Sequence, residues 1–410
     1  MELASSSTKS NVMANDGDDQ ICSLPSGTKV HSYLEGNANV LLKLDCPESS
    51  CLSRKNMLLR LRKEKHASKK STEQAFSQFQ NYIKPLFSAK DIVKQSLVRL
   101  SDDTVEQANQ SLKANAQRSK KRHGSYAAHD QYGLLLENMM PPSLDELGNE
   151  HHVDFFEFKP KWLVQSPSAP KNARRCRTCA LREMRSYDRG RESHDMVEKA
   201  AQSYFCPLDL VSEKFDDVLR AARGICSSSS KNGMGDEDQE ARVNILAKVI
   251  ARHPLLLRLR DLQEQYNFVS LDDFADNRHF PEGEKAHAIK RGISMTLRDC
   301  TVLLAVSYES ANSDDFFNTD DEEAAKAMDC GLSAVKMKLC DLDFKDGSGG
   351  KVAYWKNIER RLIDEGWYMG RRALDTILQG DSAESSEQTA SSQNICFLAR
   401  HVGDSGRLNP

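Results

Sequence analysis

Short apolar runs separated by turn residues fill the first third of the chain, a pattern typical of β-strands. The run from 29 to 44, KVHSYLEGNANVLLKL, predicts two strands joined by the small-residue turn Glu35–Asn39. Further runs at 56–65 and 132–142 predict two more strands, the second ending at a polar break. Apolar residues recur at helical spacing from 72 to 112, interrupted at Pro85. We therefore expect a strand-rich first lobe at about 29–148.

The middle of the chain mixes a few strands with many helices. VDFFEFKPKWL predicts a strand that ends at Lys159–Pro160, because proline cannot donate to a sheet ladder. Strand-like apolar sequence also surrounds Asp299, at 294–308, and leads into Asp341, at 334–345. Helical spacing predicts helices at 193–205, 212–225, 241–266 with a break at Pro254, and 352–368. Strands first and helices later predict an α+β fold with two lobes, the second at 149–379.

Several segments lack hydrophobic periodicity and are rich in polar residues. We expect a disordered arm at 1–28 and a disordered tail at 380–410. A low-complexity insert at 226–240 and an acidic loop at 310–325 interrupt the second lobe.

Composition narrows the class of protein. The 410 residues carry a formal net charge of -3, so a basic site must be local, and a polycation that binds nucleic acid nonspecifically is excluded. No signal-like segment and no apolar run of roughly 20 residues is present, which predicts a soluble intracellular protein. The 11 cysteines, an odd number, favour reduced thiols over a disulfide framework.

Positive charge is concentrated between Glu157 and Arg185, where eight basic residues accompany two acidic ones. A proline-rich break, QSPSAP, suggests a loop that carries cations into a pocket. Arginine forks and lysine point charges together suit a ligand with many phosphates, although nucleic acid and a membrane phosphoinositide are alternatives. The pair Cys176 and Cys179 has CxxC spacing, but one pair without a second nearby is weak support for zinc, and packed thiols are favoured.

Two further features suggest phosphate chemistry, each with a plainer alternative. The turn at Glu35–Asn39 followed by Arg60 on the next strand fits a nucleotide phosphate site, or an ordinary hairpin with a solvated strand face. Backbone groups at Glu137 and Asn138 could hydrogen-bond an adenine, or belong to a plain linker.

Carboxylates at two places suggest the reaction itself. In DLDFK, strand alternation would put Asp341 and Asp343 on one face, where Mg²⁺ could hold them together, with Lys345 beside it; the alternative is a solvated strand end. Asp299 lies in apolar sequence and is either a cap or a buried functional carboxylate that accepts a substrate proton.

Taken in order, the motifs EFKPKWLVQSPSAP, RRCRTC, FCPLDL, LRDCT and DLDFK resemble the inositol-pentakisphosphate 2-kinase family in its fungal form. The family signature E-x-K-P-K matches Glu157, Lys159, Pro160 and Lys161, and the resemblance covers about 29–368. It implies a divergent bilobal protein-kinase-like fold whose larger lobe carries a helical inositide-binding insertion. It also implies transfer of the ATP γ-phosphate to the 2-hydroxyl of inositol 1,3,4,5,6-pentakisphosphate, giving inositol hexakisphosphate.

The resemblance also implies roles for individual residues. Lys159 and Asp299 are expected to be catalytic, and Asp341 and Asp343 to hold Mg²⁺. Nucleotide contacts are expected from Gly36, Asn39, Arg60, Glu137, Asn138 and Asp341. Inositide contacts are expected from Lys161, Arg177, Arg185, Lys345, Lys351, Tyr354 and Arg122.

The remaining expectations concern cofactors, partners and alternatives. ATP is the expected co-substrate and Mg²⁺ the expected metal, with no further metal. We expect a monomer in the nucleus and cytoplasm that binds neither nucleic acid nor membrane stably. The alternative functions are a catalytically inactive inositol-polyphosphate-binding scaffold and a nucleic-acid or zinc-dependent adaptor built on RRCRTC.

Overall fold

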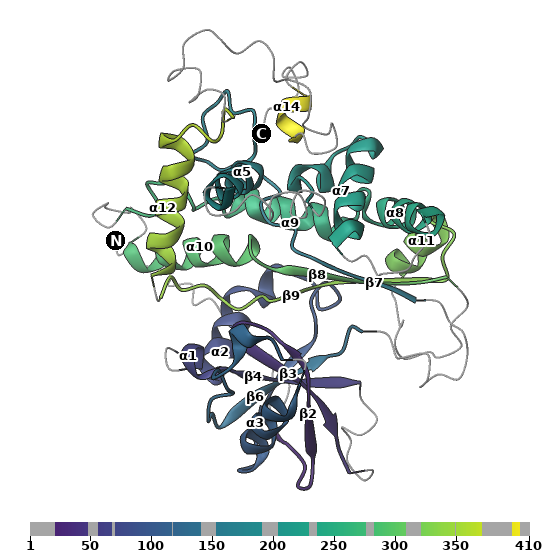
Figure 1. Ribbon diagram of the computed structural model, residues 1–410, viewed down its shortest axis with the longest axis vertical. Helices are drawn as coiled ribbons and strands as arrows, with labels where there is room; N and C mark the ends of the chain where they lie inside the picture. The colour runs from purple at the N-terminus through teal and green to yellow at the C-terminus, as the bar shows by residue number, and fades with distance from the viewer. Residues whose placement is uncertain are drawn as a thin grey trace, which may run out of the picture. The chain divides into compact units, whose positions relative to one another are not determined.

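The computed structural model divides the chain into two compact units (Figure 1). Unit 1 is Met1–Glu64 with Ser96–Leu135, and unit 2 is Lys65–Gln95 with Leu136–Pro410. Among the helices described, none has the length and hydropathy needed to cross a membrane. The structure describes residues 21–47, 56–67, 70–116, 118–140, 153–190, 204–228, 236–275, 283–308, 321–348, 350–370 and 396–401.

Unit 1 is built on a six-stranded sheet in the order β1-β5-β6-β4-β3-β2. Its strands are β1 (Cys22–Ser23), β2 (Lys29–Glu35), β3 (Asn39–Asp45), β4 (Met57–Arg62), β5 (Gln95–Arg99) and β6 (Tyr132–Glu137). The helical segments in or bordering this unit are α1 (Glu64–Ala67), α3 (Thr104–Ala114) and the 3-10 turn η2 (Lys120–Arg122).

The core of unit 1 follows from alternation along β3 and from the apolar face of α3. Val40 and Leu42 are fully buried on one face of β3. Ala108 and Leu112, four residues apart on α3, are buried in the same cluster. The backbone N–H of Ser32 on β2 donates to a side chain of α3, which fixes the helix against the sheet edge.

Unit 2 contains a three-stranded antiparallel sheet, β7 (Val153–Phe158), β8 (Thr301–Ser307) and β9 (Ala334–Cys340). Phe158 pairs with Val302, and Thr301 pairs with Cys340. This register brings the end of β7, the start of β8 and the end of β9 to one edge of the sheet. Any polar residue just beyond those three ends must therefore lie near the others.

Helices cover this sheet, and α7, α8, α9 and α10 lie on one side of it in Figure 1. The helical segments of unit 2 are α2 (Thr72–Tyr82), η1 (Lys84–Leu86), α5 (Arg177–Gly190), η4 (Pro207–Val211), α7 (Phe215–Ser228), α8 (Asp236–Ile250), α9 (Pro254–Gln265), α10 (Glu284–Leu297), α11 (Asp321–Asp329), α12 (Lys351–Asp364) and α14 (Phe397–Arg400). The apolar faces of α2, α7, α8, α9, α10 and α11 meet the strands in one large core that includes Phe156, Leu256 and Leu304, whereas α5 and α12 pack together in a separate cluster.

The mixed composition of the structure confirms the α+β class, and the strands predicted before 65 and at 132 and 153 are present. Two secondary-structure predictions were wrong. The helical pattern from 72 to 112 contains strand β5, and the strand-like sequence at 294–308 begins inside helix α10. Residues 292–297 are buried on every side, so the last turn of α10 shows no helical periodicity in the sequence.

Several predicted boundaries also differ from the structure. β1 lies inside the predicted arm, and α14 lies inside the predicted tail. Residues 1–20 of the arm and residues 380–395 and 402–410 of the tail fall outside the described residues. Residues 65–95 group with unit 2 instead of the first lobe. The predicted insert and acidic loop are partly helical, in α8 and α11, and the predicted helix at 193–205 falls mainly outside the described residues.

Candidate functional site

Charged residues gather where the three strands of unit 2 reach one edge. Lys159 follows the end of β7, Asp299 lies in the turn between α10 and β8, and Asp341 follows the end of β9. These residues are separated by up to 182 positions in the sequence, yet their side chains are in contact. The structure thus brings together the residues that the motifs singled out.

Asp299 lies at the centre of this site and faces three lysines. The Nζ of Lys161 is 3.0 Å from one carboxylate oxygen, and the Nζ of Lys345 is 3.0 Å from the other. Lys159 is 3.9 Å from the carboxylate and donates to the backbone carbonyl of Asp299 at 3.0 Å. Burial alone would raise the pKa of Asp299, but Lys345, Lys161 and Lys159 outweigh it and lower the pKa to about 2. Asp299 is therefore ionised at neutral pH.

Lys159 connects the two aspartates. Its Nζ is 3.4 Å from Asp341 Oδ2, and Thr301 Oγ1 donates to the same oxygen at 2.8 Å. Burial would lower the pKa of Lys159, but Asp299 and Asp341 raise it, so this lysine carries a full positive charge at the site.

Backbone strain marks the same place. Three non-glycine residues among those described have positive φ, and two of them are Lys161, at 58°, and Asp341, at 56°. A left-handed conformation costs about 1–2 kcal/mol for a residue with a Cβ, and such strain collects at functional sites.

A buried glutamine, which sequence reasoning missed, holds the first strained turn. Gln263 Nε2 donates to the carbonyls of Lys161, at 2.8 Å, and Leu297, at 3.0 Å. Its Oε1 accepts from the backbone N–H of Leu163 at 2.8 Å. Gln263 therefore ties the turn after β7 to the end of α10 and positions Lys161 near Asp299. Nothing in the sequence around Gln263 distinguishes it from other polar residues on α9.

The structure removes the reason for predicting that the carboxylates of Asp341 and Asp343 share one strand face. Strand β9 ends at Cys340, and the left-handed backbone at Asp341 breaks the alternation that would have placed both carboxylates on one face. Lys345 is positioned differently, because its backbone N–H donates to Thr296 Oγ1 at 3.0 Å, at the end of α10.

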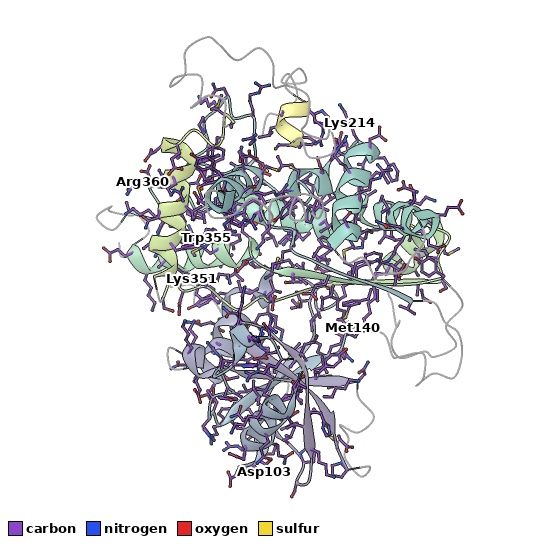
Figure 2. The ribbon with its side chains drawn as sticks, viewed as in Figure 1. Asp103, Met140, Lys214, Lys351, Trp355 and Arg360 are labelled. Carbon is purple, nitrogen blue, oxygen red and sulfur yellow. The ribbon has the colours of Figure 1, made fainter. Side chains whose placement is uncertain are left out.

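A second group of predicted residues lies on α5 and α12. Arg185 donates to the hydroxyl of Tyr354 at 2.8 Å, and Tyr354 is 49% exposed. Lys351 is exposed one turn earlier on the same helix, and Figure 2 shows it with Trp355 and Arg360 along α12. The structure therefore brings Arg185 and Tyr354 together at an exposed position.

Arg177 does not fit its predicted role as an inositide contact. It is 5% exposed, its Nε is 2.6 Å from Glu359 Oε2, and its guanidinium lies over the rings of Trp162 and Trp355. An arginine that is buried and paired in this way stabilises packing between α5 and α12. The assignment of Arg177 to the inositide, which was based on the CxxC motif, therefore does not fit the structure.

Glu137 differs from its prediction as well. Its backbone N–H, one of the backbone groups that could have met an adenine, already donates to the carbonyl of Lys94 at 2.9 Å. Its carboxylate is 2.8 Å from Nζ of both Lys336 and Lys338. Burial would raise the pKa of Glu137, but its hydrogen bonds with these lysines lower it. Asn138 Oδ1 accepts from the backbone N–H of Met140 at 3.0 Å.

The turn predicted to hold nucleotide phosphates is a closed hairpin in unit 1. The N–H of Gly36 donates to the carbonyl of Asn39 at 2.9 Å, and a Cβ on Gly36 would meet that oxygen at 3.4 Å. Arg60 is 7% exposed on β4, and Arg122 ends η2. The structure thus places these four predicted residues in unit 1 without testing their role.

A buried ion cluster beneath this hairpin was missed from the sequence. Lys63, 1% exposed, donates to Glu35 at 2.6 Å, and Arg118 donates to both oxygens of the same carboxylate at 2.8 and 3.0 Å. Burial would raise the pKa of Glu35, but Arg118 and Lys63 lower it. The cluster fixes the position of the hairpin, and the cation directly after β4 was the only signal for it.

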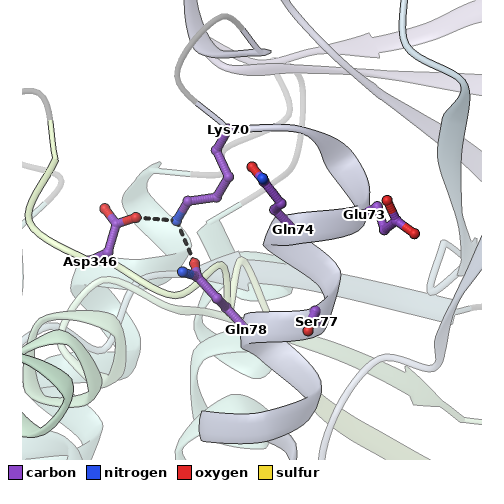
Figure 3. A pocket seen from close by; sticks show the side chains of 6 residues that line it. All are labelled: Lys70, Glu73, Gln74, Ser77, Gln78 and Asp346. Carbon is purple, nitrogen blue, oxygen red and sulfur yellow. Dashed lines mark hydrogen bonds and ion pairs between the residues drawn. The ribbon is translucent and has the colours of Figure 1, made fainter. Parts of the chain in front are cut away.

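A hollow of ≈ 660 Å³ lies in unit 2 between α2 and the segment after β9 (Figure 3). Asp346, the residue after Lys345, lines it from one side, and Lys70 bridges Asp346 and Gln78 of α2, at 2.5 Å each. The hollow is thus lined by Lys70, by polar side chains of α2 and by Asp346 in the segment after β9.

Comparison with known proteins agrees with the motifs. The family model described as inositol-pentakisphosphate 2-kinase matches residues 33–361. A protein of that name from Yarrowia lipolytica is 27% identical over 247 residues, which cover 58% of this chain and 65% of the relative. Another from Debaryomyces hansenii is 27% identical over 227 residues, covering 46% of this chain and 54% of the relative. The chain therefore spans just under two thirds of the first relative's length and about half of the second's.

Proposed function

The chain belongs to the inositol-pentakisphosphate 2-kinase family, and from this premise we propose that it transfers the γ-phosphate of ATP to the 2-hydroxyl of inositol 1,3,4,5,6-pentakisphosphate. The observation that carries the proposal is the ring of three lysines around Asp299. A phosphoryl transfer to an acceptor with five phosphates requires cations and a carboxylate at the reacting hydroxyl, and this site holds both.

The lysines supply charge neutralisation. Lys159, Lys161 and Lys345 carry side chains that are 25–39% exposed, so their ammonium groups are accessible to an anionic ligand. Each charge-assisted hydrogen bond to a phosphate contributes roughly 1.5–3 kcal/mol. Arg185, held by Tyr354, adds a cation with a bidentate fork on α5.

Asp299 is the group we assign to proton transfer from the acceptor hydroxyl. With a pKa of about 2 it is a weak base while three lysines surround it. Phosphates that compete for these ammonium groups would draw them away and raise the pKa of Asp299 toward its ordinary value. Substrate binding would thereby make the carboxylate a better proton acceptor at the moment it is needed.

The donor set after β9 suits Mg²⁺. Asp341 has a carboxylate that is 52% exposed, and Mg²⁺ is commonly bound by one or two carboxylates together with substrate phosphates. When bound, Mg²⁺ supplies charge neutralisation on the transferred phosphate. Thr301 orients Asp341 by donating to one of its oxygens.

The finer parts of the family assignment are proposals of the same kind. We infer that the two units are the lobes of a divergent kinase-like fold. Nucleotide contacts are assigned to Gly36, Asn39 and Arg60, and action in the nucleus and cytoplasm is part of the same inference.

The test compares wild-type protein with Asp299→Asn in an assay with ATP, Mg²⁺ and the pentakisphosphate. General-base catalysis contributes about 10²–10⁴-fold, so we expect kcat to fall by that factor. Removing the anion leaves three lysines free for phosphate, so KM for the inositide should stay the same or fall. Asp261→Asn, which alters an exposed pair with Arg260, is the matched control and should retain full activity.

Two results would overturn the proposal. Wild-type protein that binds the pentakisphosphate in calorimetry but forms no hexakisphosphate would instead be the inactive scaffold. Full turnover by Asp299→Asn would remove Asp299 from its assigned role and leave the phosphotransfer without its base.

A further inference from the structure

Helix α2 and the residue before its N-cap contact the segment that follows β9 at two places within unit 2. The rings of Tyr82 and Phe344 have centroids 4.9 Å apart, and Lys70 pairs with Asp346 at 2.5 Å. Phe344 and Asp346 flank Lys345, one of the three lysines of the candidate site. These contacts therefore hold the segment on both sides of a residue of that site.

The aromatic contact is also packed against α10. Phe344 is 8% exposed, and a Cβ on Gly292 of α10 would clash with its ring, so glycine at that position lets the ring approach the helix. The backbone N–H of Lys345 donates to Thr296 Oγ1 of the same helix at 3.0 Å. Helix α10 thus fixes the backbone of the segment up to Lys345.

The ion pair fixes the segment just beyond Lys345 (Figure 3). The side chain of Lys70 is 13% exposed, and its Nζ is 2.5 Å from both Asp346 Oδ2 and Gln78 Oε1 of α2. The other carboxylate oxygen of Asp346 accepts from the backbone N–H of Ser348 at 3.0 Å. Burial would raise the pKa of Asp346, but the hydrogen bonds from Lys70 and Ser348 lower it, so the carboxylate is ionised at neutral pH.

A charged aspartate next to Lys345 needs a counter-charge if Lys345 is to bind a phosphate. Without one, Asp346 would repel an anionic ligand, because like charges a few ångströms apart repel strongly where water is partly excluded. Lys70 supplies the counter-charge, and its hydrogen bond to Gln78 holds the ammonium group in one place. Lys70 thus neutralises Asp346 and also anchors the backbone that carries Lys345.

We propose that Lys70 is a positioning residue for the inositide, acting through Asp346 on Lys345. This inference rests on the proposed function, because it takes the ligand of Lys345 to be an inositol polyphosphate. The ammonium group of Lys70 is held by Asp346 and Gln78, so Lys345 meets the phosphate and Lys70 does not. Helix α2 is then part of the structure that supports the inositide site.

The experiment measures Kd by calorimetry, and turnover with ATP and Mg²⁺, for full-length protein and the pentakisphosphate. A charge-assisted hydrogen bond contributes roughly ten- to a hundredfold in affinity, so a partial loss of the Lys345 contact in Lys70→Met should raise Kd and KM by about three- to tenfold. KM for ATP and kcat should change little, because Thr301 and Lys159 hold Asp341 independently. Lys70→Arg keeps the positive charge and should retain the wild-type affinity.

A second substitution distinguishes action through Asp346 from a direct contact with the ligand. Asp346→Asn in the Lys70→Met background removes the uncompensated charge and should restore much of the affinity for the pentakisphosphate. Asp261→Asn in the same background also removes one negative charge, at an exposed position, and should restore nothing. Lys84→Met removes an exposed lysine two residues after α2 and should bind the pentakisphosphate like the wild type.

Three outcomes would overturn the proposal. These are wild-type Kd and KM in Lys70→Met, an equal loss of affinity in Lys84→Met, and a loss that Asp346→Asn does not relieve, which would make Lys70 a direct ligand contact. If Lys70→Met fails to fold, Lys70→Gln gives the same test with a polar side chain. Wild-type protein that binds the pentakisphosphate without phosphorylating it would refute the phosphotransfer and leave the Kd comparison intact, whereas protein that does not bind it would refute both.

Discussion

Replacing Glu359 with glutamine would remove the charge from an enclosed polar network between α5 and α12. Glu359 is fully buried and accepts hydrogen bonds from Arg177 Nε, Ser166 Oγ and Tyr368 Oη, each at 2.6 Å. The amide keeps the shape of the side chain, so the change tests charge and not volume.

The expected loss of stability can be estimated in two ways. A hydrogen bond to a charged group contributes about 1.5–3 kcal/mol and a neutral one about 0.5–1.5, so three bonds together lose about 3–4 kcal/mol. Leaving Arg177 as an unpaired buried cation costs about 3–5 kcal/mol. These are two accounts of one effect, and both predict that Glu359→Gln lowers the free energy of unfolding by about 3–5 kcal/mol.

Urea unfolding followed by tryptophan fluorescence measures this loss directly. The chain has three tryptophans, Trp162, Trp355 and Trp367, and the guanidinium of Arg177 lies over the first two. All three belong to unit 2, so the signal reports on the unit that contains Glu359.

Two further variants separate the cause from a general effect of the substitution. Glu240→Gln, on α8, weakens an exposed pair with Arg223 and should cost less than about 1 kcal/mol. The double variant Glu359→Gln with Arg177→Met removes the stranded cation and should recover much of the loss. The reasoning is refuted if Glu359→Gln is no less stable than Glu240→Gln, or if the double variant recovers nothing.

Two other predictions follow from groups outside this network. His253 is buried and caps α9, and burial first, then Lys326 and Lys90, lower its pKa to about 4. In the unfolded chain this histidine binds a proton near pH 6.5, so the free energy of unfolding should fall by about 2 kcal/mol between pH 7 and pH 5. His253→Asn keeps a capping side chain and should flatten this pH dependence. An unchanged pH slope in the urea midpoints of the variant would exclude His253 as the cause. Arg185→Met should raise KM for the pentakisphosphate by roughly tenfold or more, and Tyr354→Phe should raise it by a few fold, with kcat retained in both. Arg223→Met, on α7, is the control and should not change KM. Equal KM values in the two arginine variants would exclude Arg185 from the inositide site.

The sequence singled out residues that meet in the candidate site, because they lie directly beyond strand ends, while their roles stay predictions. Lys159 and Asp341 each follow a strand whose apolar run is easily recognised, and Asp299 precedes a third. Antiparallel pairing then brings such residues together without any long-range information in the sequence. The resemblance of the motifs to a known family supplied the expected roles of these residues, which their spacing alone left open.

Other parts depended on contacts that no local pattern encodes. Arg177 looked like its neighbours in a basic run, and only the packing of α12 against α5 shows that Glu359 buries it. The fourth turn of α10 lost its periodicity because the helix is enclosed there, and the left-handed backbone at Asp341 is held by its surroundings and not by a glycine. Cys206 and Cys396 lack a paired spacing, so their meeting with the CxxC motif could not be predicted.

Four buried cysteines of unit 2, Cys176, Cys179, Cys206 and Cys396, have Sγ atoms that all lie within 4.8 Å of one another, and this cluster bears on how the chain matures during translation. Cys176 and Cys396 are separated by 220 residues. At about 5–20 residues per second, the ribosome needs roughly 10–40 s to make the intervening chain. Throughout that interval the first cysteines have emerged while their last partner does not yet exist. The nascent chain therefore passes through a stage in which these thiols are open to oxidation or to chaperones, and the arrival of the C-terminal segment ends it.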